Sequence, residues 1–163
     1  MSDNGVYLGN PNLKKANTPI EFTQEQVLEF MKCKDDPVYF ANNYIKIVSL
    51  DEGLTQFHPY HFQEKLITNF HENRFNICKM PRQTGKSTTV VSYLLHYAVF
   101  NDSVNIGILA NKAATARELL SRLQTAYENL PKWMQQGIIS WNKGSLELEN
   151  GSKILAASTS ASA

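Results

Sequence analysis

The stretch KMPRQTGKSTTVV, residues 79–91, limits what this 163-residue chain can fold into more than any other feature. It contains Gly85-Lys86-Ser87, the last three positions of the phosphate-binding pattern Gly-x-x-x-x-Gly-Lys-Ser/Thr. The first glycine of the pattern is absent, because Met80 stands five residues before Gly85. The tripeptide alone also occurs by chance, so its neighbourhood decides whether it marks a site.

A phosphate-binding loop follows a strand and opens a helix, so that backbone N–H groups and the helix N-terminus face the phosphates. Residues 75–80, FNICKM, predict the strand, and residues 86–101, KSTTVVSYLLHYAVFN, predict an almost wholly apolar helix. Residues 104–110, VNIGILA, form a continuous apolar run that predicts a strand buried on both faces. The setting therefore favours a nucleotide site over a chance match.

The alternation continues towards the C-terminus. Residues 111–131 predict an amphipathic helix that Pro131 ends, with an apolar face of Ala116, Leu119, Leu120, Leu123, Ala126 and Leu130. Asn150-Gly151 lies between two alternating runs and is a strong hairpin signal. From residue 75 the order is strand, loop, helix, strand, helix, strand and hairpin, which predicts an α/β fold with a parallel sheet flanked by helices.

The first third of the chain carries weaker signals. Residues 1–19 are polar and predict a flexible arm, and residues 20–54 predict a helical region. In that region Thr23 and Gln26 form a capping box, and Asp36-Pro37 opens a second helix. The remaining expectations are a strand over 45–50, a loop over 51–59, and a helix over 59–73 with Phe62, Leu66 and Phe70 on one face.

Composition excludes several classes of protein. The formal net charge is +1, which by itself indicates neither a nucleic acid nor a membrane surface as partner. No apolar run reaches the roughly 18 residues of a membrane helix, and no signal peptide is visible. Cys33 and Cys78 are predicted to be free thiols, and the histidine spacing matches no metal motif. We therefore expect an intracellular protein that is not secreted.

The chemistry of the loop assigns roles to its residues. Gly85 permits close approach of phosphate, Lys86 supplies a charge to the β- and γ-phosphates, and the Ser87 hydroxyl can ligate Mg²⁺. Arg82 either stabilises charge at the γ-phosphate during transfer or is a solvated loop residue. The expected cofactors are ATP and Mg²⁺, and the remaining expected binding residues are Gln83, Thr84 and Thr88.

Three stretches resemble the large terminase subunits of T-even-like tailed bacteriophages. MPRQTGKST is similar to their deviant Walker A loop, which replaces the first glycine and carries an arginine. YHFQEKLI is similar to their adenine-contacting glutamine motif, and the sequence from GILANKAATARELL to WNKGSLELENGSKI is similar to the same group. The resemblance covers residues 55–160, and WNKGSLELENGS is its most specific part.

The resemblance implies an ASCE-type P-loop ATPase domain in a motor that drives double-stranded DNA into a capsid. It also implies a nuclease domain, a portal protein and a small terminase subunit as partners, and a place in the host cytoplasm or at the procapsid. By position, Arg82 would be the loop arginine of the family, and Gln63, with Gln56 as second candidate, would bond the adenine edge. Tyr60 or Phe62 would pack against the base.

One expected feature is missing from the sequence. The resemblance implies a Walker B strand that ends in two carboxylates, and none follows the loop; Glu147 and Glu149 are predicted to be exposed on the hairpin. We expect residues 55–163 to be a partial ATPase domain that is truncated before Walker B, is inactive alone and associates through an exposed sheet edge. A helicase-like ATPase, a small kinase and a noncatalytic nucleotide-binding module remain alternatives.

Overall fold

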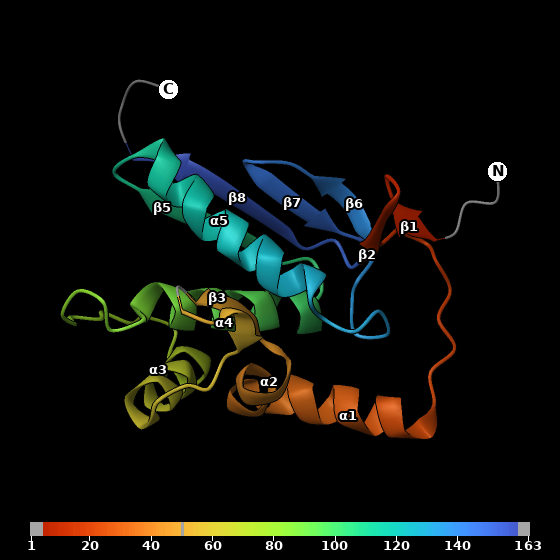
Figure 1. The fold of residues 1–163 in the computed structure, drawn as a ribbon, viewed down its shortest axis with the longest axis horizontal. Coiled ribbons are helices and arrows are strands. Elements are labelled where there is room, and N and C mark those ends of the chain that lie inside the picture. The colour runs from red at the N-terminus through yellow and green to blue at the C-terminus, as the bar shows by residue number, and fades with distance from the viewer. Residues whose placement is uncertain (1–4, 50, 160–163) are drawn as a thin grey trace.

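The computed structural model describes residues 5–49 and 51–159. The main sheet has four strands. Figure 1 shows the helix α5 across one face of this sheet, α4 beneath α5, and α1, α2 and α3 on the far side of α4. The helices are α1 (Gln24–Asp35), α2 (Pro37–Tyr44), α3 (His61–Glu72), α4 (Lys86–Phe100) and α5 (Ala113–Glu128). The strands are β1 (Val6–Tyr7), β2 (Asn10–Lys14), β3 (Lys46–Ser49), β4 (Gly53–Gln56), β5 (Asn105–Ala110), β6 (Ile138–Trp141), β7 (Ser145–Leu148) and β8 (Lys153–Ser158).

The main sheet has the strand order β5-β8-β7-β6, and it is mixed. Only β5 and β8 are parallel, whereas β8, β7 and β6 are antiparallel neighbours. The α/β class is confirmed, but the prediction of a parallel sheet is wrong for two of the three pairings, β8 with β7 and β7 with β6. The physical reason is the hairpin at Asn150-Gly151, where Gly151 has φ +81° and the tight turn forces β7 and β8 into opposite directions.

The buried core extends from the main sheet through α5 and α4 to the N-terminal helices. Ala116, Leu120, Leu123 and Ala126 are buried, as the helical period predicts, and α5 packs against β5 and β8. The expectation that β5 is buried on both faces is wrong, because Ile106 and Ile108 are buried while Leu109 is 65% exposed. Among the described residues, α5 is the helix that covers the main sheet. Within the same part of the chain, the opposite face of the sheet is open.

Residues 75–80 do not form the predicted strand. Phe75 is 84% exposed and Ile77 fully exposed, and no ladder joins this stretch to a strand in the described part of the chain. An apolar, β-rich run becomes a strand only when a neighbouring strand satisfies its N–H and C=O groups. The helix half of the predicted strand-loop-helix unit is confirmed, because α4 begins at Lys86.

The N-terminal segment is folded rather than loose from residue 5 onwards. The strands β1 and β2 form a hairpin, Leu13 is 2% exposed, and Lys15 forms a parallel bridge with Ile138 of β6. The Glu149 carboxylate accepts hydrogen bonds from the backbone N–H groups of Gly137 (2.7 Å) and Asn17 (2.8 Å). The prediction of a flexible arm is therefore wrong for these residues; residues 1–4 lie outside the described part.

The two acidic residues of the hairpin differ. Glu149 is held in this network and pairs with Lys14 (2.9 Å), and Lys14 is itself only 8% exposed. Its bonds to Lys14, Asn17 and Gly137 lower the pKa of the Glu149 carboxyl although burial opposes them. Glu147 instead forms an ion pair with Lys153 across the hairpin. The prediction that Glu149 is exposed is wrong, because its partners come from distant parts of the chain.

The local helix signals are confirmed. Thr23 and Gln26 form the predicted capping box, and Asp36 accepts from the Tyr39 N–H (2.8 Å) with Pro37 at the first position of α2. The predicted loop 51–59 contains β4, which pairs with β3; Leu50 lies outside the described residues.

The predicted apolar face of α3 is displaced by one position. Gln63 and Ile67 are the buried residues of this helix, whereas Phe62 is 45% exposed.

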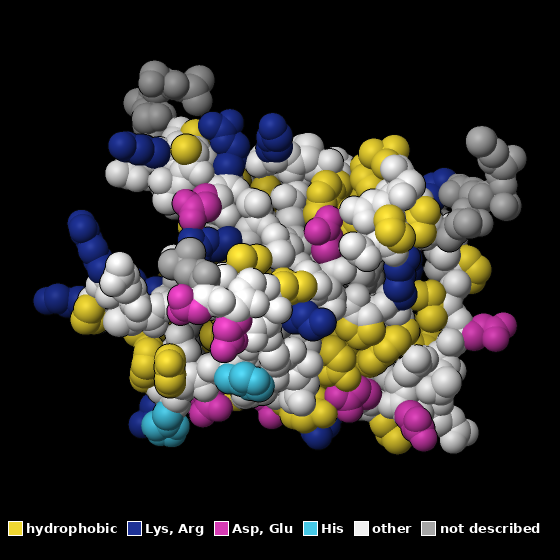
Figure 2. Space-filling view, in the orientation of Figure 1, with side chains coloured by type: hydrophobic (Ala, Val, Ile, Leu, Met, Phe, Trp, Pro, Cys, Tyr) yellow, Lys and Arg dark blue, Asp and Glu magenta, His cyan; other side chains and the backbone are white. Residues whose placement is uncertain are grey.

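No helix of the described chain is long and apolar enough to cross a membrane. Basic and acidic side chains are interspersed on the face that Figure 2 shows, in keeping with a net charge of +1.

Candidate functional site

The loop before α4 contains two residues in the left-handed backbone conformation. Gln83 and Gly85 both lie in the left-handed region, with φ of 61° and 73°, and Gly85 is the N-cap of α4. The Thr84 hydroxyl donates to the Pro81 carbonyl (3.0 Å), which closes the loop on itself. Left-handed residues next to a helix start turn successive N–H groups to one side of the backbone.

In the part of the chain that the structure describes, those N–H groups have no acceptor. Among the described residues, no oxygen accepts a hydrogen bond from the backbone N–H of residues 83–88. The first turn of any helix leaves such donors unpaired, and the helix dipole adds positive potential there. The loop therefore offers a row of free donors to an anion.

The Lys86 side chain is folded back onto the loop. Its Nζ donates to the carbonyl oxygens of Met80 (2.9 Å) and Pro81. The ammonium thus replaces the hydrogen bonds that a strand would have given these carbonyls. A phosphate that binds Lys86 must compete with both of them.

Arg82 and Ser87, the other predicted phosphate and Mg²⁺ residues, are exposed. Neither side chain makes a hydrogen bond or ion pair with another residue of the described chain. Both are therefore accessible to a ligand. In the described part of the chain no group of three or more His, Cys, Asp or Glu residues could hold a metal ion.

A cavity of about 530 Å³ lies beside the loop. It brings together six of the predicted binding residues from α3, α4, β4 and the loop, namely Gln56, Gln63, Gln83, Thr84, Gly85 and Thr88. Tyr60 and Phe62 line the same cavity with stacked rings, 5.8 Å between centroids and 11° between planes. Lys86 and Ser87 line a separate, smaller cavity of about 150 Å³ with Ile108 and Leu119.

The two glutamines predicted to contact adenine both bind backbone in this structure. The Gln56 Nε2 donates to the carbonyls of Asn42 (3.0 Å) and Ile45 (2.9 Å). The Gln63 Oε1 accepts from the Tyr60 N–H (2.9 Å), and its Nε2 donates to the Thr84 carbonyl (3.2 Å). Gln63 is 4% exposed, so it reaches the loop but presents little of its amide to the cavity.

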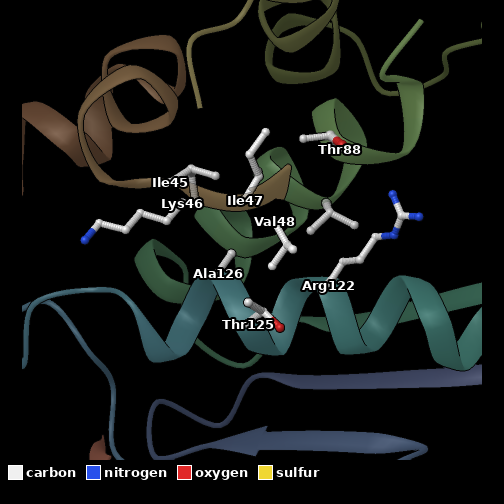
Figure 3. Close-up of a pocket in the computed structure, with 9 residues that line it drawn as sticks. Ile45, Lys46, Ile47, Val48, Thr88, Arg122, Thr125 and Ala126 are labelled. Carbon is white, nitrogen blue, oxygen red and sulfur yellow. The ribbon is translucent and has the colours of Figure 1, made fainter. Parts of the chain in front are cut away.

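A third cavity, which the sequence did not indicate, adjoins these two. It has a volume of about 470 Å³ and lies between β3, α4 and α5, lined by Ile45, Lys46, Ile47, Val48, Thr88, Val91, Arg122, Thr125 and Ala126. Figure 3 shows Arg122 extending from α5 towards the start of α4. Because Thr88 lines this cavity and the one beside Gln63, the two share a wall. These residues are far apart in the sequence, so no local sequence pattern predicts that they line one cavity.

The helix α4 is anchored at its far end. His96 is 2% exposed, and its Nε2 lies 2.8 Å from the Cys33 carbonyl at the end of α1. Since a carbonyl only accepts, Nε2 carries the proton, and within the described chain Nδ1 has no partner. Burial lowers the pKa of His96 to about 4, so the imidazole is neutral at pH 7.

These features define a class of protein: an α/β domain whose free N–H donors, cation and hydroxyls gather at the start of one helix. The chain belongs to the family described as terminase large subunit, T4likevirus-type, N-terminal, whose model matches residues 77–163. The resemblance drawn from the sequence is thereby confirmed.

Solved structures agree on the fold. The crystal structure of the large terminase of bacteriophage HK97 superposes with a TM-score of 0.63 at 16% sequence identity. The match covers 80% of this chain and 28% of that chain, so this chain spans less than a third of the HK97 protein. A likeness at this identity concerns the fold alone.

Proposed function

We propose that this chain is the ATP-binding part of a viral DNA-packaging motor of the terminase type. The loop 80–88 binds the triphosphate, and family membership assigns that nucleotide to a packaging machine. Double-stranded DNA, a portal protein and a small terminase subunit are the partners we assign to the whole motor. This assignment places the protein in the cytoplasm of the host cell and at the procapsid.

One observation carries the nucleotide part of the proposal: the N–H groups of residues 83–88 at the start of α4, which have no acceptor among residues 5–49 and 51–159. Free donors at a helix N-terminus bind phosphate oxygens, and the glycine at 85 lets phosphate approach the backbone. Lys86 and the exposed Arg82 are the cations assigned to the β- and γ-phosphates.

The residues present also fit a magnesium ion that arrives with the nucleotide. Mg²⁺ keeps several waters and takes most of its other ligands from phosphate oxygens, so one protein hydroxyl is sufficient. The exposed Ser87 hydroxyl is the ligand we assign. The ion would supply charge neutralisation at the phosphates, while the chain's own part is to bind and orient the triphosphate.

The aromatic wall of the adjoining cavity is assigned to the base. Tyr60 and Phe62 are 71% and 45% exposed and stack in parallel, so the outer ring has a free face for a purine. Gln56 and Gln63 line the same cavity. Base selection would then come from the shape of the cavity and from those polar groups that remain accessible.

The test is isothermal titration calorimetry of the chain with Mg²⁺-ATP. Lys86→Ala should weaken binding by about 1.5–3 kcal/mol, the range for hydrogen bonds to charged groups, which is roughly 10- to 150-fold in Kd. Lys79→Ala is the matched control, because it removes an exposed lysine next to the loop without touching it. Equal affinity of the wild type and Lys86→Ala would overturn the assignment of the site.

A further inference from the structure

Gln63 is a buried amide that spans two elements. At 4% exposure its polar atoms need partners, and each end has one: the Tyr60 N–H on Oε1 and the Thr84 carbonyl on Nε2. The first bond caps the start of α3, and the second reaches 21 residues along the chain into the loop. The side chain thereby joins α3 to the loop before α4.

The contact with the loop is close. A Cβ added to Gly85 would lie 2.4 Å from the Gln63 Nε2, so the amide packs directly against the glycine. The Thr84 carbonyl and the Gly85 N–H belong to one planar, trans peptide group and point in opposite directions. A hydrogen bond that holds this carbonyl towards α3 therefore holds the Gly85 N–H away from α3.

The Gly85 N–H is one of the free donors of the loop. Its direction is set by the single peptide group that joins Thr84 to Gly85, and Gly85 has a left-handed φ of 73°. Such a peptide could rotate if nothing held its oxygen, and the Gln63 Nε2 is the side-chain donor that holds it.

We propose that Gln63 is a positioning residue that orients the Thr84–Gly85 peptide for phosphate binding, rather than a reader of adenine. This proposal rests on the proposed function of the loop as a triphosphate site. It assigns Gln63 an effect on every ligand that carries a triphosphate, whatever its base. An adenine reader would affect ATP alone.

The experiment compares three ligands in the presence of Mg²⁺: ATP, GTP and inorganic tripolyphosphate, which has no base. Binding to the wild type, Gln63→Ala and Gln63→Met is measured by calorimetry. Gln63→Met keeps the side-chain volume and removes both hydrogen bonds, so it separates the bonds from the packing. All three affinities should fall by the same factor, about three- to tenfold, the range for neutral hydrogen bonds.

Gln26→Ala is the matched control. Gln26 occupies the same position on α1, where its Oε1 accepts from the Thr23 N–H (3.0 Å), but it is not bonded to the loop. This variant should lower the melting temperature through the same lost cap and leave all three affinities unchanged. A general loss of stability therefore cannot imitate the positioning effect.

The outcomes are distinct. If the Gln63 variants lose affinity for ATP alone, Gln63 reads adenine and the proposal is overturned. Unchanged affinity for all three ligands overturns it as well. If the wild type binds none of them, the proposed function itself fails, which is visible without any variant, and the positioning role fails with it.

Discussion

Acidification between pH 6.5 and pH 4 should destabilise this protein through His96. The side chain is 2% exposed on α4, where the Cys33 carbonyl fixes Nε2 as the protonated nitrogen and, within the described chain, Nδ1 has no partner. Burial lowers the pKa of His96 to about 4, from an ordinary value of 6.5. A second proton on Nδ1 would place a charge among aromatic rings, with Phe100 at 4.9 Å and His71 at 6.1 Å between ring centroids.

The sign follows from proton binding. Above pH 6.5 His96 is neutral in both the folded and the unfolded state, so it adds no pH dependence. Between pH 6.5 and pH 4 the unfolded state binds a proton that the folded state rejects, and the free energy of unfolding falls by about 1.4 kcal/mol per pH unit. Over this window the loss accumulates to about 3 kcal/mol, a large share of the roughly 5–15 kcal/mol of a typical domain.

The assay is urea unfolding at pH 7, 6, 5 and 4.5, followed by tryptophan fluorescence, for the wild type and His96→Gln. Glutamine does not titrate, so its curve keeps only the pH dependence of the other groups, including the depressed carboxyl of Glu149. The wild type should lose more stability than the variant as the pH falls. Parallel pH profiles would refute the inference that His96 is buried in its neutral form.

Two further predictions concern the N-terminal segment and the loop. Glu149→Ala should destabilise the protein by about 2–3 kcal/mol, because it leaves two backbone donors and Lys14 without their acceptor. Glu147→Ala removes only a partly exposed ion pair and should cost about 0–1 kcal/mol, so equal urea-unfolding midpoints for the two variants would contradict this. Gly85→Ala should lower stability and Mg²⁺-ATP affinity more than Gly53→Ala does. Both glycines have positive φ, but only a Cβ at position 85 meets the Gln63 side chain. Equal effects of the two variants in thermal melts and calorimetry would refute the close contact between Gly85 and Gln63.

Much of the local structure was predictable because its interactions span only a few residues. The capping box of Thr23 and Gln26 and the turn at Asn150-Gly151 both join neighbours in sequence. The apolar face of α5 follows from the helical period alone. The start of α4 was also predictable, because Gly85 and Lys86 belong to a pattern that opens a helix.

Predictions that needed knowledge of a distant partner fared worse. Residues 75–80 have the composition of a strand, but they have no neighbouring strand in the described part of the chain. The strand β5 is apolar throughout, yet α5 covers it on one face only, so Leu109 is exposed. The composition of a segment shows that it has apolar side chains to bury. It does not show which other parts of the chain will cover them.

The sequence by itself therefore determined the α/β class, the approximate positions of the helices and the start of α4 at Lys86, since these depend on backbone geometry within one or two turns. Only the tertiary structure decided the strand order, the hydrogen-bond network around Glu149 and the hydrogen-bond partners of Gln63. Glu149 bonds Asn17 across 132 positions, and Gln63 bonds Thr84 across 21. Because hydrogen bonds act over about 3 Å, such pairs carry no signal until folding brings them into contact.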